Sequence, residues 1–495
     1  MAEKIIIIGG GIAGLTAGIL AQKYGYTSEI FEAHSIVGGE CTGWNREGFH
    51  IDNCIHWMTG TNKNTSLYRL WHETDALSDD TQIIYNDTFY TSLVGGRRLS
   101  LYSDKEKTRR ELLEISPEDK KSINRFINAV KTTECVKMPV DMPLDLMPKG
   151  KLMKLGMSMI KGLKPMKKYG PMTVAEFAQG FRSPLIRTLL SDYLPGDFSA
   201  FALLASYATI TGGNGGIPSG GSLKMAMRMA DKYRSLGGVI HTSSPVRTID
   251  IKLGHAQSIT LADGTVAKGD YFIPTCDTAV IFGGMLDKKY MPAQLAENYK
   301  TMDVHPQFIA AFGVDDKCEF MELNEIFDCE ELTAAHTTVK RIGVRNYSYE
   351  PSFAPAGKTV LQSSVWQSSE DYVFWETLYT TDKKAYDRKK NETAEQLLLR
   401  IEKQYPQLKG KIKVIDVITP YTYNRFTGAY KGAYMNFVYT PQALQQQSMT
   451  GLLHGIDNVV LGSQWLQLPG GLPCAASCGK FAVQRIAAGL NTQEP

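Results

Sequence analysis

The sequence predicts an α/β protein in which a Rossmann-type nucleotide-binding domain is joined to a discontinuous α+β domain with a helical lid. Three observations lead to this fold class: a glycine-rich turn between a strand and a helix at the amino end, an acid after the next strand, and a glycine-rich bend before a helix at the carboxy end. The chain has 495 residues, which is too long for one compact core, so more than one domain is expected.

The glycine-rich turn is Gly9-x-Gly11-x-x-Gly14, which follows a run of four isoleucines. The first glycine permits a tight turn, the second lets the backbone approach a pyrophosphate, and the third lets the helix pack closely on the strand. Ile12 and Ala13 open that helix, whose first N–H groups can point toward phosphates. We therefore predict that these five residues hold a dinucleotide.

Glu32 stands at the end of the next short apolar run and is followed by Ala33. It comes about 20 residues after the turn, where this class of nucleotide-binding unit places the acid that bonds the ribose hydroxyls. An acid here, rather than an arginine, disfavours NADP, because a carboxylate would repel a 2′-phosphate. FAD and NAD both remain open at this point.

Composition argues against several classes of protein. The formal net charge of +3 is small for this length, so no nucleic-acid partner is expected. No apolar run reaches 18 residues, so no transmembrane helix is predicted. The first predicted strand begins almost at Met1 and the eight cysteines lack metal-type pairing, so we expect a cytoplasmic protein with free thiols and no metal site.

The next two blocks are Gly38-Gly39-Glu40 and Gly48-Phe-His-Ile-Asp52. A second close backbone approach just beyond the ribose suits a cofactor that lies extended across the protein. In this order the blocks resemble the amino-oxidase-type FAD fold, in the branch that contains phytoene desaturases, carotenoid isomerases and retinol saturase. The resemblance implies that FAD is the cofactor and that Gly38, Gly39 and Glu40 lie beside it.

Two later segments extend the resemblance over nearly the whole chain. In the middle, a glycine-rich loop, a helix and a Gly-Gly turn lead to Val246, which by resemblance contacts the adenine through its backbone. Near the carboxy end, a strand passes through Gly462 and a bend at Gly471 into a helix that begins near Leu472 or Pro473. By resemblance this segment closes over the flavin, where a helix N-terminus can stabilise negative charge.

The three matching blocks divide the chain into alternating pieces of two domains. We predict an FAD-binding domain made of residues 1–75, 214–285 and 446–495, and a substrate domain made of residues 76–213, which include the helical lid, and residues 286–445, which form a sheet.

The chain departs from the phytoene desaturase pattern at two places. Glu40 stands where an arginine usually follows the paired glycines, and Ser463-Gln464 replaces a common Gly-Asp. The pair His56-Trp57 is closer to retinol saturase, which has an aromatic residue after a histidine at these positions. We expect His56 to lie near the flavin ring, with a hydrogen-bonded structural histidine as the alternative.

The candidates for a proton donor or a polar anchor in the reaction are His56, Cys54, Arg425 and Tyr207. Of these, only His56 is supported by a motif.

Residues 147–169 contain seven lysines, five methionines and no acid. One interpretation is a solvated, flexible lid helix, weakened by its glycines. The other is a peripheral membrane contact, with lysines toward anionic headgroups and methionine and leucine toward the acyl chains.

We predict an FAD-dependent oxidoreductase that acts on C–C or C=C bonds of a lipophilic, isoprenoid- or polyene-like substrate. Desaturation, saturation and isomerisation stay open. No second Rossmann fingerprint is present, so electrons must pass to or from an outside carrier, a quinone, oxygen or the substrate itself. The alternatives are an amine-oxidase-like flavoprotein and a non-catalytic FAD-binding lipid carrier or escort.

Overall fold

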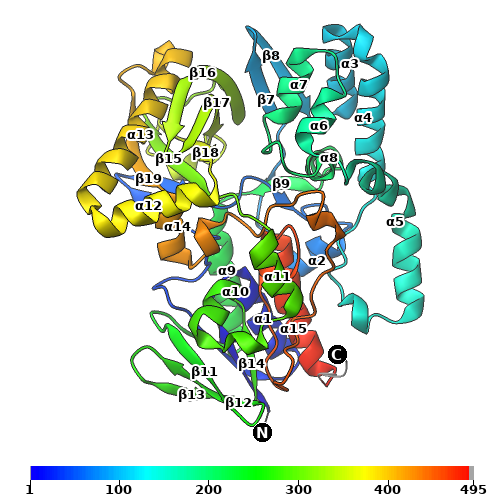
Figure 1. The fold of residues 1–495 in the computed structure, drawn as a ribbon, viewed down its shortest axis with the longest axis vertical. Helices are drawn as coiled ribbons and strands as arrows, with labels where there is room; N and C mark the ends of the chain where they lie inside the picture. The colour runs from blue at the N-terminus through cyan, green and yellow to red at the C-terminus, as the bar shows by residue number, and fades with distance from the viewer. Residues whose placement is uncertain (1, 490–495) are drawn as a thin grey trace.

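The computed structural model describes residues 2–489, so residues 490–495 of the last predicted segment lie outside the described residues. Figure 1 shows three parts. A nucleotide-binding part at the bottom holds the first strand and the last helix, a large sheet with its helices lies at the upper left, and a helical part lies at the upper right.

The nucleotide-binding part is built on a four-stranded parallel sheet in the order β10-β2-β1-β14. As predicted, β1 (Lys4–Ile8) leads into α1 (Ile12–Lys23), which returns the chain to β2 (Thr27–Phe31). The outer strands β10 (Val239–His241) and β14 (Tyr271–Pro274) come from the middle of the chain. The isoleucines of β1 are almost fully buried, as expected for a parallel strand that is covered on both faces.

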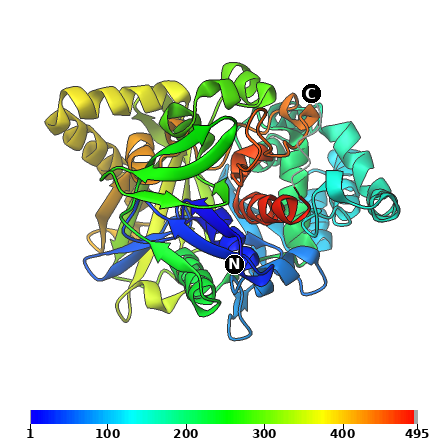
Figure 2. The same cartoon turned by 90° about the horizontal axis from the view of Figure 1, so that it is seen from below.

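Two helices from distant parts of the chain lie beside α1. They are α9 (Gly221–Ser235), which follows the middle glycine-rich loop, and α15 (Leu472–Ala487), the last described helix. α15 approaches α1 so closely that a Cβ on Gly479 would lie 2.1 Å from the carbonyl oxygen of Ala13. Figure 2 shows α15 next to the first strands. The carboxy end of the chain therefore completes the amino-terminal βαβ unit.

Three small sheets surround this unit. The sheet β11-β12-β13 is antiparallel, β3 and β4 form a hairpin, and β9 pairs with both β5 and β6. Their bounds are β3 (Gly43–Arg46), β4 (Phe49–Asp52), β5 (Met58–Thr59), β6 (Ile83–Ile84), β9 (Gly215–Pro218), β11 (Val246–Lys252), β12 (His255–Leu261) and β13 (Val266–Lys268).

The large sheet has seven strands in the order β19-β15-β18-β17-β16-β7-β8, antiparallel except between β16 and β7. One face packs on α12 and α13 through apolar side chains such as Phe308, Phe312 and Trp375. The bounds are β7 (Thr88–Val94), β8 (Arg97–Tyr102), β15 (Gln307–Val314), β16 (Asn324–Ala334), β17 (Thr337–Asn346), β18 (Thr359–Trp366), β19 (Ile412–Ile418), α12 (Ser369–Thr381), α13 (Lys383–Gln404) and α14 (Pro420–Thr427). This packing leaves the other face of the sheet to line the site.

The helical part packs around an apolar core that includes Phe126, Phe177 and Leu204. Its helices are α3 (Lys105–Ile115), α4 (Lys120–Thr133), α5 (Lys149–Tyr169), α6 (Val174–Gln179), α7 (Pro184–Ser191) and α8 (Ala200–Thr211). The remaining helices are α2 (Ser66–Glu73) and α11 (Ala293–Thr301), with a short turn at α10 (Thr278–Val280).

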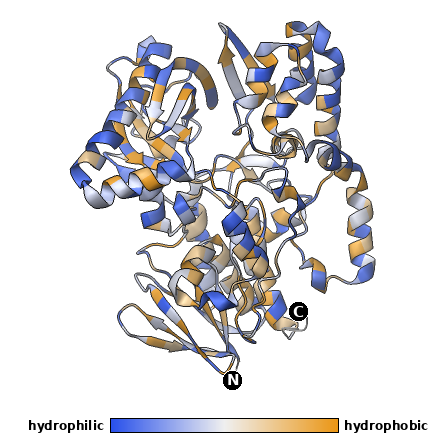
Figure 3. Cartoon of the chain, in the orientation of Figure 1, coloured by the Kyte–Doolittle hydropathy of each residue, from blue (hydrophilic) through white to orange (hydrophobic). Residues whose placement is uncertain are grey.

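α5 stands at the edge of the molecule in Figure 1, and its ribbon mixes polar and apolar colours in Figure 3. Among the described residues, no helix combines the length and the apolar character needed to cross a membrane.

Candidate active site

A cavity of 2690 Å³ is lined by the nucleotide-binding part, the open face of the large sheet and the helical part. It is much larger than the roughly 300–1,000 Å³ of a typical small-ligand pocket. Thirteen of the predicted cofactor-binding residues line it: Gly9, Gly11, Ile12, Ala13, Glu32, Ala33, Gly38, Gly39, Glu40, Val246, Gly471, Leu472 and Pro473. The other two, Gly14 and Gly462, lie where elements pack closely, because an added Cβ would come within 3.0 Å of neighbouring atoms.

The glycines of the first turn have different surroundings. A Cβ on Gly14 would lie 1.9 Å from the carbonyl oxygen of Gly9, and Gly9 itself has a φ of 105°. A Cβ on Gly11 would meet nothing closer than the carbonyl oxygen of Gly38 at 3.8 Å. Gly14 therefore serves helix packing, Gly9 serves the turn, and Gly11 leaves space for a ligand that approaches the backbone. α1 starts next to it with no side-chain cap, which leaves its first N–H groups free for phosphate.

Glu32 is buried at the end of β2, with its carboxylate beside this turn. One carboxylate oxygen accepts a hydrogen bond from the Gly10 N–H at 2.6 Å, and the other accepts one from the His34 N–H at 2.7 Å. A carboxylate has about four acceptor positions, so two of them remain for ribose hydroxyls.

The N-terminus of α15 faces the same cavity from the far end of the chain. Gly471 precedes the helix with a φ of 83°, and its N–H donates to Oε1 of Gln464 at 2.7 Å. The N–H groups of Leu472 and Cys474 lie in the first turn, where an α-helix offers no internal acceptor. These free N–H groups and the helix dipole favour negative charge at this wall of the cavity.

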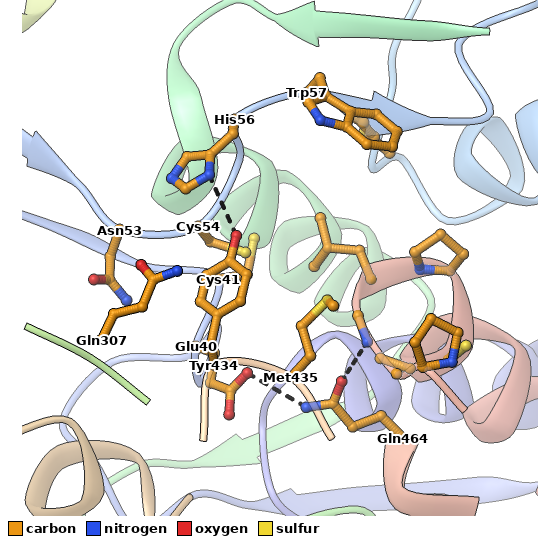
Figure 4. Close-up of a pocket in the computed structure, with 18 of the residues that line it drawn as sticks. Glu40, Cys41, Asn53, Cys54, His56, Trp57, Gln307, Tyr434, Met435 and Gln464 are labelled. Carbon is orange, nitrogen blue, oxygen red and sulfur yellow. Dashed lines mark hydrogen bonds between the residues drawn. The ribbon is translucent and has the colours of Figure 1, made fainter. Parts of the chain in front are cut away.

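The two departures from the phytoene desaturase pattern contact each other. Nε2 of Gln464 donates to Oε2 of Glu40 at 3.3 Å, although the two residues are 424 positions apart. Figure 4 shows the chain of hydrogen bonds from Glu40 through Gln464 to the start of α15. A glutamate and a glutamine thus stand where the related pattern has an arginine and an aspartate.

Asp277 is a second buried acid on this wall, and sequence reasoning missed it. Its carboxylate accepts hydrogen bonds from the N–H groups of Ala279 and Tyr430, both at 2.7 Å. Burial raises the pKa of Asp277 to about 7. Burial, together with the charge of Asp277, raises the pKa of Glu40 well above its usual range. The raised pKa favours the protonated form of the Glu40 carboxyl, which carries less negative charge toward a cofactor with phosphates.

His56 and Tyr434 form a pair on the cavity wall, as Figure 4 shows. The Tyr434 hydroxyl lies 3.3 Å from Nδ1 of His56, and the two rings are stacked with centroids 6.0 Å apart. Nε2 of His56 has no hydrogen-bond partner among the described residues. The imidazole is therefore oriented by one nitrogen and has the other available to a ligand.

Cys54 lines the same region and lies beside Cys41. Interaction with the Cys41 thiol, followed by burial, raises the pKa of Cys54 well above its usual range. The thiol therefore stays protonated at neutral pH, and a thiolate nucleophile is not expected here.

The other two candidates lie elsewhere. Arg425 is exposed at the rim of the cavity, where its guanidinium lies 4.5 Å from the centre of the Tyr379 ring. Tyr207 is fully buried in the helical part, and its hydroxyl bonds the Thr108 hydroxyl at 2.7 Å and the Tyr102 carbonyl at 2.8 Å. Tyr207 does not line the cavity, so the suggestion that it donates a proton to substrate is wrong.

The open face of the large sheet supplies further residues that the sequence did not single out. Gln307, Arg345, Gln362 and Trp366 line the cavity from three adjacent strands. Only the period-2 alternation of these strands could have indicated that they share a face. Trp366 meets Tyr434 edge to face, with centroids 6.0 Å apart.

Together these residues fit an extended dinucleotide. The open space at Gly11 and the uncapped start of α1 suit phosphates, and the buried carboxylate of Glu32 suits ribose hydroxyls. The cavity then continues to His56, Tyr434 and the sheet, which leaves room for a second molecule.

Comparison with known proteins agrees with a dinucleotide-binding site. The family model described as flavin containing amine oxidoreductase matches residues 12–487. The 4,4'-diapophytoene desaturase of Methylomonas sp is 25% identical over 87% of this chain and 84% of its own. The all-trans-retinol 13,14-reductase of Rattus norvegicus is 22% identical over 87% and 77%. An oxidoreductase structure from Methanosarcina mazei has a TM-score of 0.60 at 16% identity, covering 98% of this chain and all of the other.

The family match confirms the predicted amino-oxidase-type fold and the predicted flavin cofactor, and the dinucleotide turn identifies that flavin as FAD. Because the match covers nearly the whole chain, the assignment does not depend on the amino-terminal motif alone. The chain belongs to the family of flavin containing amine oxidoreductases.

Proposed function

We propose that this protein uses FAD to change C–C or C=C bonds in a lipophilic, isoprenoid- or polyene-like molecule. The observation that carries the proposal is the continuity of the cavity, which runs from the dinucleotide turn past His56 and Tyr434 to side chains such as Phe89 and Trp366. Relatives named for desaturation of diapophytoene and for reduction of retinol support this substrate class.

The cofactor half of the proposal assigns a role to each wall. The turn with Gly9 and Gly11 and the start of α1 would hold the pyrophosphate, Glu32 the ribose, and the backbone at Val246 the adenine. Gly38, Gly39 and the N-terminus of α15 would lie along the flavin half. Each of these segments lines the cavity.

Bound FAD supplies hydride transfer, and the protein supplies orientation, exclusion of water and a held proton. His56 is the candidate for holding that proton, because Tyr434 bonds one ring nitrogen and the other is available. Cys54 lines the same region with a protonated thiol and is a weaker candidate. Arg425 is assigned to the rim, where it can only contact a ligand that extends out of the cavity.

Electrons would enter or leave through an outside carrier, a quinone or oxygen. The sequence has a single Rossmann fingerprint, so a nicotinamide cofactor has no second domain to bind. A redox-neutral isomerisation would need no such partner.

We further propose that α5 contacts a membrane surface peripherally. Met153, Met157 and Ile160 are exposed by 63%, 56% and 55%, which is unusual for three apolar side chains in one helix. The lysines of α5 surround them, while Met159 and Met166 on the inner side of the helix line the cavity. A lipophilic substrate could thus pass between an anionic bilayer and the cavity.

Amine oxidation is the second candidate, favoured by the family description. The guanidinium of Arg345 on the cavity wall argues against it, because it would repel a substrate ammonium. A non-catalytic lipid carrier or escort would bind its ligand in the same cavity, and its flavin would not exchange electrons with that ligand.

The experiment prepares the holoenzyme anaerobically in two forms, with oxidised flavin and with photoreduced flavin, and mixes each form with a linear polyene or with a primary amine. The oxidised form can desaturate the polyene or oxidise the amine, and the reduced form can saturate the polyene. Chromatography of the products decides between the candidates. A change in the number or geometry of double bonds supports the proposal. Amine-dependent peroxide release in air favours the amine oxidase, and a flavin inert toward every donor and acceptor favours the escort.

A further inference from the structure

Arg345 is the one cation on the cavity face of β17 that lacks a carboxylate partner among the described residues. Arg341 lies four residues earlier on the same face of the strand and is bonded to Asp192 at 2.7 Å and to Asp328. Arg345 makes no ion pair within residues 2–489, and its Nε donates to Oδ1 of Asn324 at 2.9 Å.

The geometry fixes the guanidinium while leaving its outer edge free. Asn324, which accepts from Nε, also donates to the carbonyl oxygen of Phe89 at 3.2 Å, where β16 meets β7. The two Nη atoms have no acceptor within hydrogen-bond distance in the described part of the chain, and neither is sealed off from solvent. A guanidinium has five N–H donors, so four of them have no acceptor among the described residues, and Arg345 lines the cavity.

The guanidinium of Arg345 acts on the part of the cavity that holds Tyr434 and His56. Arg345 lines the cavity with Tyr434, and its charge acts on the Tyr434 hydroxyl, where burial raises the pKa and Arg345 opposes that rise. Tyr434 is bonded to His56, so the guanidinium and the candidate proton holder act on the same region.

We propose that Arg345 binds the carboxylate end of an otherwise apolar substrate. The proposal rests on the function given above and narrows the substrate to a long-chain, polyene-like acid. An exposed guanidinium edge matches a carboxylate with two parallel N–H···O bonds, which fix the orientation of a molecule that has no other polar group.

A single negative charge is the best match for this wall. The nearest arginine on the strand, Arg341, is already neutralised by two acids, so a dianionic phosphate would meet only one free guanidinium. A neutral hydrocarbon would leave the four donors without acceptors once the cavity excludes water.

The test uses the intact holoenzyme and three matched probes: cis-parinaric acid, its methyl ester and the corresponding alcohol. Binding is followed by the change in flavin absorbance. The wild type should bind the acid roughly ten- to a hundredfold more tightly than the ester, because hydrogen bonds to charged groups add about 1.5–3 kcal/mol. R345Q should bind the ester unchanged and lose the preference for the acid.

Two further variants keep the test informative. R345K should retain a weaker preference, because it keeps the charge but not the planar fork, and it replaces R345Q if that variant fails to hold FAD. R187Q removes a half-buried arginine at another part of the cavity lining, where it donates to Gln179, and should behave as the wild type. Equal affinity for acid and ester in the wild type, or a preserved preference in R345Q, overturns the proposal. If none of the three probes binds, both the proposed lipophilic substrate and the proposed role of Arg345 are refuted.

Discussion

Gln464 and Glu40 are hydrogen-bonded across the whole length of the chain, at 3.3 Å between Nε2 and Oε2. They are the two positions at which this sequence departs from the phytoene desaturase pattern. Their contact links the two departures, because a hydrogen-bonded glutamine and glutamate stand where the related pattern has an aspartate and an arginine.

The first prediction follows from that contact. In a double-mutant cycle, E40R and Q464D should be coupled favourably by roughly 0.5–3 kcal/mol in the free energy of unfolding, because the double variant recreates an arginine–aspartate pair. Denaturant unfolding of the holoprotein measures the four corners of the cycle. If the effects of the two substitutions on the free energy of unfolding are strictly additive, the two side chains do not act as a pair.

His56 and Tyr434 give the second prediction. H56Q and Y434F should each keep FAD bound, and H56Q should lower turnover by roughly 10²-fold or more, the usual loss for a positioned acid or base. H454Q, which changes an exposed histidine outside the cavity, is the control. Normal turnover of H56Q with a lowered melting temperature would instead assign His56 a structural role.

Asp277 gives a prediction about pH. Its pKa is raised by burial to about 7, so between about pH 4 and 7 the folded protein keeps a proton that the unfolded chain has lost. The stabilisation that comes from the retained proton on Asp277 is greatest at low pH and is lost as the pH rises through 7. Relative to the wild type, D277N should therefore gain up to roughly 3 kcal/mol between pH 5 and pH 8. If the free energy of unfolding depends on pH in the same way for the wild type and D277N, the pKa of Asp277 is not raised by folding and the carboxylate is charged in the folded protein.

The lysines of α5 give the fourth prediction. Replacing Lys154, Lys161, Lys164 and Lys168 with glutamine should weaken sedimentation with anionic vesicles at least tenfold, because each lysine near such a surface contributes about 1 kcal/mol. The same number of changes on α13, at Lys384, Arg388, Lys389 and Lys403, should have little effect. If both sets behave alike, α5 is only a solvated lid.

The sequence predicted the fold and the flavin cofactor, and for a physical reason. The strand, the turn around Gly11 and the helix are adjacent in sequence, and each needs a specific residue type, so local patterns are enough. The helix after Gly471 was also predicted, because a glycine-rich bend into an apolar helix is a local signal.

The substrate half could not be read in the same way. Tyr434, Asp277 and Arg345 come from separate segments that only the order of the strands brings together, and no local pattern distinguishes them from core or surface residues. Tyr207 illustrates the opposite error. Its helix is apolar as expected, but the hydroxyl is used inside the helical part by Thr108 and Tyr102.

The central claim is that three distant segments form one FAD site, and the amount of FAD per chain tests it most directly. The purified wild-type protein should release one FAD per chain on denaturation. G11A should fold, because the new methyl group meets nothing closer than 3.8 Å in the protein, yet hold little FAD, because the methyl group occupies the pyrophosphate's place. A colourless wild-type protein that cannot be reconstituted with FAD, or a G11A variant with full FAD content, would contradict the account.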